Sequence, residues 1–235
     1  MLAVGAYEKC KRYINQHSAE SEKKKETYPC ITISRLTGSG SYEVSEKLIN
    51  ILQESTKEPE SPWTYFNKEL IQTVIEDFNL PKVFTNYIIE DKYHHIKDAV
   101  NDLLGVRPSE WTIVHRTTEI ILQLARYGKV IVVGRGSNVI TARLSNSFHV
   151  RLIAPIESRI KHVQEVFEYS KSEAMEYIKR EDANRTKYLK SHFFRDPNDE
   201  NLYHLIINTG KFSYQETAEI IAETVINKYS QCFYT

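Results

Sequence analysis

The stretch Ile31–Leu48, ITISRLTGSGSYEVSEKL, decides the fold. Its β-branched start predicts a buried strand over Cys30–Ile33, and its second half predicts a helix over Tyr42–Gln53 with an apolar face. The glycines Gly38 and Gly40 lie between the two. Glycines let successive backbone N–H groups point inward, and a helix N-terminus carries about half a positive charge, so this order can form an anion cradle. An ordinary strand-to-helix turn containing GSG fits the same letters.

Further along the chain, short apolar runs alternate with helical stretches. This alternation predicts a three-layer α/β fold, with a parallel sheet of about five strands and helices on both of its faces. A ligand is expected at the carboxyl ends of the strands, where glycine-rich loops follow Ile33 and Val133. The other expected strands are Trp63–Phe66, Lys129–Val133, Phe148–Ile153 and His204–Ile207. The other expected helices are Leu2–Gln16, Lys68–Phe78, Pro81–Ile89, His94–Leu104 and Glu110–Tyr127, one that starts at Pro155, one from Ser170 to about Lys190, and one after Ser213.

Two parts are expected in the chain. Residues 1–28 hold the first helix and a charged linker, SAESEKKKE, and residues 29–235 hold the α/β domain. We expect the first helix to pack on this domain or on a second subunit, and the latter arrangement would make a homodimer.

The amino-acid composition limits the classes of function that are open to the chain. Lys plus Arg and Asp plus Glu are 31 each, so no overall charge attracts nucleic acid or a membrane, and an anionic ligand needs a local cluster. Three distant cysteines predict a reducing compartment. No run approaches the ~18 apolar residues of a membrane span. We therefore expect a cytoplasmic enzyme or binding protein without a membrane partner.

The glycine loop departs from the phosphate-binding pattern G-x-x-x-x-G-K-[ST]. Ser41 stands at the lysine position, Tyr42 at the hydroxyl position that holds magnesium, and Arg35 at the first glycine. Another cation must then supply the missing charge, and Arg35 is the nearest in sequence. The magnesium ligands stay open.

Four segments in order, KVIVVGRGSNVI, FHVRLIAP, KREDANRTKYL and LYHLIINT, together with the glycine loop resemble the cytidylate kinase-like family from about Pro29 to Val225. The resemblance implies a P-loop nucleoside monophosphate kinase fold with a helical lid at about residues 178–200. It also implies ATP with Mg²⁺ and phosphoryl transfer to a CMP-like acceptor. The residues implied to hold the donor phosphates are Gly38, Ser39, Gly40, Ser41 and Tyr42.

The resemblance also implies roles for three charged residues. Arg135 of the GRG tripeptide would meet the acceptor phosphate, Asp182 the ribose, and Arg185 of the D-x-x-R element a phosphate. With Arg35, Arg135 and Arg185 form the expected set of catalytic cations. The usual acidic residue of a GRD tripeptide is Gly136 here. Each role has a structural alternative: a surface ion pair for Asp182 and Arg185, and carbonyl binding at a strand end for Arg135.

Three functions remain open. The first is an ATP-dependent nucleoside monophosphate kinase acting on CMP or dCMP. The second is a catalytically weak or inactive nucleotide-binding module on the same fold, for which the missing lysine argues. The third, an RNA-binding domain that uses the basic lid, is weaker, because the basic cluster is short and contains acids.

Overall fold

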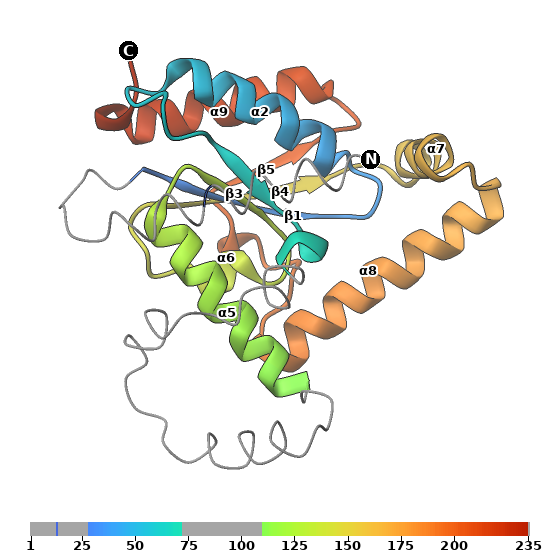
Figure 1. The fold of residues 1–235 in the computed structure, drawn as a ribbon. Helices are drawn as coiled ribbons and strands as arrows, with labels where there is room; N and C mark the ends of the chain where they lie inside the picture. Colours follow the sequence, from blue (N-terminus) through green and yellow to red (C-terminus); the bar gives the residue numbers. More distant parts are fainter. Residues whose placement is uncertain (1–12, 14–27, 72–109, 235) are drawn as a thin grey trace.

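A computed structural model describes Tyr13 and residues 28–71 and 110–234 of the chain (Figure 1). Its centre is a sheet of five parallel strands in the order β2-β3-β1-β4-β5. This confirms the predicted sheet. The strands are β1 (Cys30–Arg35), β2 (Thr64–Phe66), β3 (Val130–Val133), β4 (Ser147–Ile153) and β5 (Leu205–Asn208).

Helices cover both faces of the sheet, as predicted. The helices α2 (Ser41–Ser55) and α9 (Tyr214–Lys228) lie side by side on one face, and α5 (Glu110–Tyr127) and the short α6 (Ser137–Ile140) lie on the other (Figure 1). The alternation along β1 explains both layers. Ile31 and Ile33 belong to the core under α2 and α9, whereas Cys30 belongs to the core under α5.

A helical hairpin projects from the sheet. It consists of α7 (Ile156–Phe167) and α8 (Lys171–Phe193), which leads back toward α5 (Figure 1). The helices α8 and α9 begin directly after Ser170 and Ser213, as predicted, and a capping box starts each of them, formed by Ser170 with Glu173 and by Ser213 with Glu216. Pro155, expected as the first helical residue, is the N-cap of α7. A short 3-10 helix, η2 (Glu200–Leu202), precedes β5, and η3 (Ser230–Cys232) follows α9.

Of residues 1–27, the structure describes Tyr13. Its side chain is buried, its ring meets Phe66 and Tyr127 edge to face, and its hydroxyl donates a hydrogen bond to the carbonyl of Gly128. At this point the N-terminal part therefore packs on the α/β domain. The rest of the predicted helix Leu2–Gln16 lies outside the described residues, as do most of Lys68–Phe78 and the whole of Pro81–Ile89 and His94–Leu104.

Two further observations concern the described residues only. Cys30 and Cys232 are buried free thiols. Over residues 28–71 and 110–234, no helix has the length and apolar character needed to cross a membrane.

Candidate functional site

The glycine loop joins β1 to α2. Gly38 and Gly40 have φ angles of 80° and 73°, which favour glycine, and Gly40 caps α2. A Cβ atom at Gly38 would lie 2.6 Å from the carbonyl oxygen of Arg159, and one at Gly40 would lie 2.1 Å from the ring of Tyr214. The loop is therefore packed tightly between the starts of α7 and α9, and both glycines are needed for it to fit.

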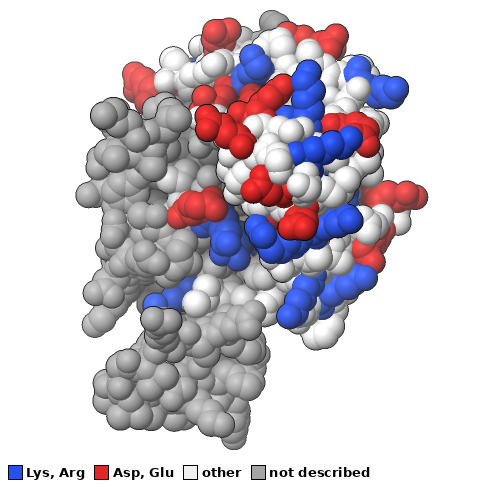
Figure 2. Space-filling view, turned by 90° about the vertical axis from the view of Figure 1, so that its right-hand side faces the viewer, with Lys and Arg blue, Asp and Glu red and all other residues white. Residues whose placement is uncertain are grey.

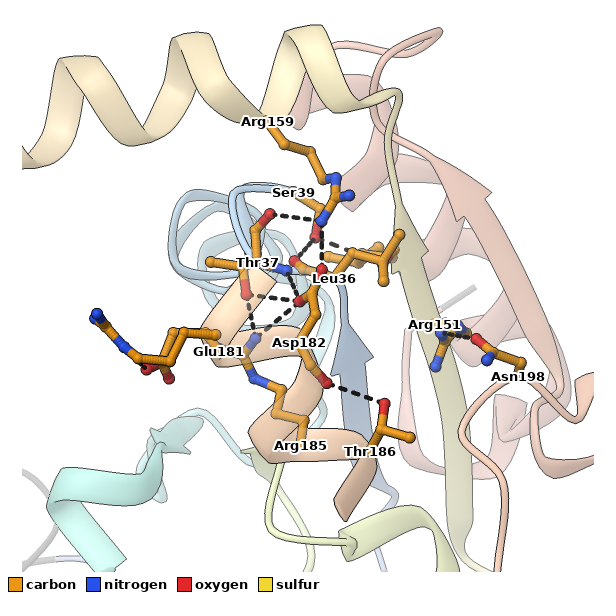
Figure 3. Close-up of polar contacts among 12 residues, drawn as sticks. Leu36, Thr37, Ser39, Arg151, Arg159, Glu181, Asp182, Arg185, Thr186 and Asn198 are labelled. Atoms are coloured by element: carbon orange, nitrogen blue, oxygen red, sulfur yellow. Dashed lines mark hydrogen bonds and ion pairs between the residues drawn. The ribbon is translucent and has the colours of Figure 1, made fainter. Parts of the chain in front are cut away.

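A carboxylate from the lid binds this loop. Asp182, in the middle of α8, accepts a hydrogen bond from the backbone N–H of Thr37 at 2.8 Å and another from the Thr37 hydroxyl at 2.6 Å, both through Oδ1 (Figure 3). The loop thus holds an oxyanion that belongs to the protein itself. A backbone N–H and a hydroxyl are donors that a phosphate oxygen can also accept from.

Two arginines surround that carboxylate. Arg159 Nη1 donates to Asp182 Oδ2 at 2.6 Å and to the carbonyl of Thr37 at 3.3 Å. Arg185 Nη1 donates to Asp182 Oδ1 at 3.2 Å and to the hydroxyl of Thr37 (Figure 3). Two positive charges therefore face one negative charge, and the group retains an excess positive charge beside the loop.

The second glycine-rich loop lies at the end of the neighbouring strand β3. Gly134, Arg135 and Gly136 all have positive φ angles, of 84°, 55° and 69°. A Cβ at Gly134 would lie 1.9 Å from Nη1 of Arg35, so the Arg35 side chain reaches from β1 across this turn. A Cβ at Gly136 would lie 2.7 Å from the ring of Phe193, so the far end of α8 packs on the same turn.

The charged side chains at this edge of the sheet favour the binding of an anion. Burial of Arg35, together with the nearby charges of Arg185 and Arg135, lowers its pKa to about 10, although Glu69 opposes the shift. The Nε atoms of Arg135 and Arg159 are buried and have no hydrogen-bond partner among the described residues. Arg135 Cζ lies 5.4 Å from the centre of the Tyr188 ring. Buried guanidinium donors without acceptors favour a ligand that brings oxygens.

Known proteins resemble this chain in sequence and in fold. Residues 30–211 match the cytidylate kinase-like family. The chain belongs to this family. A crystal structure of an uncharacterized protein from Eubacterium ventriosum superposes with a TM-score of 0.61 at 18% identity, over 85% of this chain and 98% of that one. A 117-residue stretch is 26% identical to a uronate isomerase of Corynebacterium glutamicum, half of this chain but 22% of that protein, so the chain spans about a fifth of that relative's length.

In this cytidylate kinase-like chain the expected site residues fall into two groups. Asp182 and Arg185 contact the glycine loop, whereas Arg135 lies in the turn after β3 and the Arg35 side chain reaches that turn from the end of β1. Ser41 and Tyr42 begin α2, and the Tyr42 ring turns toward Tyr65, with ring centres 5.8 Å apart. The expectation that Asp182 meets a ribose and the other residue roles stay predictions.

Two residues that bind Asp182 were not expected from the sequence. Thr37 lies inside the quoted loop, but nothing in its letters marks it as a donor to a lid residue more than 140 positions away. Arg159 follows the capping proline by four residues, so it belongs to the first turn of α7, which faces the loop. Its place in the first turn after Pro155 is the feature of the sequence that could have identified Arg159.

Residues 28–71 and 110–234 do not form a dedicated magnesium site. Within the described ranges, no three His, Cys, Asp or Glu side chains are grouped so that they could hold a metal ion. The Asp182 carboxylate is engaged by two arginines, and Tyr42 stands where a hydroxyl ligand is usual.

The face formed by α7 and α8 mixes acidic and basic side chains over its described part (Figure 2).

Proposed function

We propose that this chain transfers a phosphoryl group from ATP to a nucleoside monophosphate, with CMP or dCMP as the acceptor. The observation that carries the proposal is the oxyanion already bound at the Thr37 N–H in the glycine loop, beside a surplus of arginine charge. Membership of the cytidylate kinase-like family supports it.

The chemistry asks mainly for positioning and for cations around oxygens on which charge spreads in the transition state. ATP supplies the phosphoryl group when it is bound. The backbone of Gly38–Tyr42 would hold the donor phosphates. Arg35 and Arg135 stand at adjacent strand ends, where an acceptor phosphate would lie between them and Arg185 of the lid. The planar fork of arginine suits this work, because it can bind two phosphate oxygens at once.

Arg159 is a second candidate for the cation missing from the loop, beside Arg35, which the sequence suggested. Arg35 turns toward Gly134, whereas Arg159 reaches the carbonyl of Thr37 and so lies at the loop itself. We propose that Arg159 supplies the charge which a lysine at position 41 would otherwise bring.

A second function is a nucleotide-binding module with little or no turnover. The observation that favours it is the start of α2, where Ser41 lacks the lysine charge and the Tyr42 ring is turned toward Tyr65. Losing one well-placed charge-stabilising group costs roughly 100- to 1000-fold in rate. A module of this kind would still hold a nucleotide through the backbone of the glycine loop.

The deciding experiment is a coupled kinase assay with ATP and CMP, dCMP, UMP or AMP, together with thermal shift for each nucleotide. The kinase proposal predicts turnover with CMP or dCMP that falls roughly 100- to 1000-fold in Arg135→Ala. Arg143→Ala removes an exposed arginine between α6 and β4 and should leave turnover unchanged. Absence of turnover with all four acceptors, in a folded protein, would reject the kinase. Nucleotide-dependent stabilisation without turnover would then support the second function.

A further inference from the structure

We propose that Asp182 is an internal competitor for the donor phosphate, an anion on the lid that keeps the glycine loop latched until a ligand displaces it. This inference rests on the proposed function, because it assumes that the loop binds the phosphates of ATP.

The geometry of Thr37 gives the first step. Asp182 Oδ1 accepts hydrogen bonds from both the backbone N–H and the hydroxyl of Thr37, at 2.8 and 2.6 Å. A phosphate oxygen and a carboxylate oxygen accept the same kind of hydrogen bond from such donors. A donor phosphate that uses the Thr37 N–H must therefore displace Asp182, and the two anions exclude each other.

The arginines give the second step. Arg159 and Arg185 form ion pairs with Asp182 at 2.6 and 3.2 Å while also contacting Thr37. When the carboxylate leaves, both guanidinium groups stay beside the loop without their counter-charge. They can then bind the phosphate that replaced it, so that the exchange conserves ion pairs.

The lid gives the third step. Asp182 lies midway along α8, whereas its neighbour Glu181 forms an ion pair with Arg180, at 3.6 Å on the same helix. Within the described residues, the contacts of Asp182 with Thr37 and Arg159 thus tie the middle of α8 to the loop and to the start of α7 (Figure 3). Displacement of Asp182 by phosphate would break this direct contact, and Arg185 would then hold α8 to the loop through the phosphate.

The test compares Asp182→Asn and Asp182→Ala with Glu181→Gln, which removes a carboxylate from the same helical turn without touching the loop. Calorimetry would measure the binding of ATP and of inorganic tripolyphosphate to each protein, with circular dichroism to confirm folding. If the latched form is about nine-tenths populated, removing the carboxylate strengthens binding of both anions about tenfold. Glu181→Gln should bind like the wild type. Equal or weaker affinity in both Asp182 variants, with wild-type binding intact, overturns the latch and leaves the proposed function standing.

A second measurement needs no ligand. Hydrogen exchange at the Thr37 amide should be slow in the wild type and in Glu181→Gln, and faster in Asp182→Ala. Unchanged exchange in Asp182→Ala overturns the latch. Failure of every variant and of the wild type to bind either anion overturns the proposed function together with the latch.

Discussion

The guanidinium group of Arg35 lies against the bare backbone of Gly134, so that the last residue of β1 covers the first residue after β3. A Cβ atom at position 134 would come within 1.9 Å of Nη1 of Arg35. Glycine is therefore required there for two reasons: its φ angle is 84°, and a larger side chain would clash with Arg35. This contact joins the end of β1 to the turn that follows β3.

Gly134→Ala should move Arg35 and strain the turn. Placing alanine in the left-handed region costs roughly 1–2 kcal/mol, and a displacement of about 1 Å at a reacting centre can cost roughly 100-fold in rate. We expect a lower melting temperature and a turnover loss of that order. Arg35→Ala and the double variant complete a mutant cycle. Additive losses of turnover would show that the two residues act independently.

Substitutions at Arg135 can separate an effect on folding stability from an effect on turnover. Its φ angle of 55° is unfavourable for a residue with a side chain, and glycine adopts it freely. Arg135→Gly should therefore unfold at the same or a higher denaturant concentration than the wild type, whereas Arg135→Ala should not gain stability. Both should lose turnover. A less stable Arg135→Gly would mean that the packing of Arg135 near Tyr188 outweighs the strain.

His149 should make folding stability depend on pH. Burial, together with the charge of His204, lowers the pKa of His149 from 6.5 to about 4. Its Nδ1 lies 2.8 Å from the Thr32 hydroxyl, and its ring stacks on that of His204. Because the unfolded chain takes up the proton first as pH falls, the contribution is complete above pH 6.5 and is lost progressively as pH falls from 6.5 to about 4.

The loss from His149 between neutral pH and pH 4.5 should amount to about 2–3 kcal/mol. Urea unfolding at the two pH values measures it. His149→Gln, which cannot titrate, should show a smaller drop, although His204 also has a lowered pKa because of burial and Lys228 and adds its own share. Equal drops in the two proteins would contradict this account.

Tyr13 should anchor the N-terminal part. Its ring is buried between Phe66 and Tyr127, so Tyr13→Ala should cost about 3–5 kcal/mol, as for other large aromatic truncations. Tyr13→Phe removes only the hydrogen bond to Gly128 and should cost about 1 kcal/mol. Denaturant unfolding measures both. If Tyr13→Ala is as stable as the wild type, the N-terminal part does not contribute to the stability of the domain.

The sequence predicted the sheet well, because β-branched runs such as Cys30–Ile33 and turn glycines are local signals. Capping boxes at Ser170 and Ser213 are equally local, and the structure contains both. The contact of Asp182 with Thr37 could not be predicted in this way, because it joins residues far apart in the chain and depends on the path of α8. The direction of the Arg35 side chain depends likewise on the neighbouring strand.

The path of α8 has a consequence for how ligands influence one another. Asp182 binds the glycine loop, and Phe193, eleven residues or about 16 Å further along the helix, packs on Gly136. One rigid rod thus touches both loops at the edge of the sheet. A molecule that shifts this rod at one loop alters the surroundings of the other, and thermodynamic reciprocity then requires the two sites to change each other's affinity by the same factor.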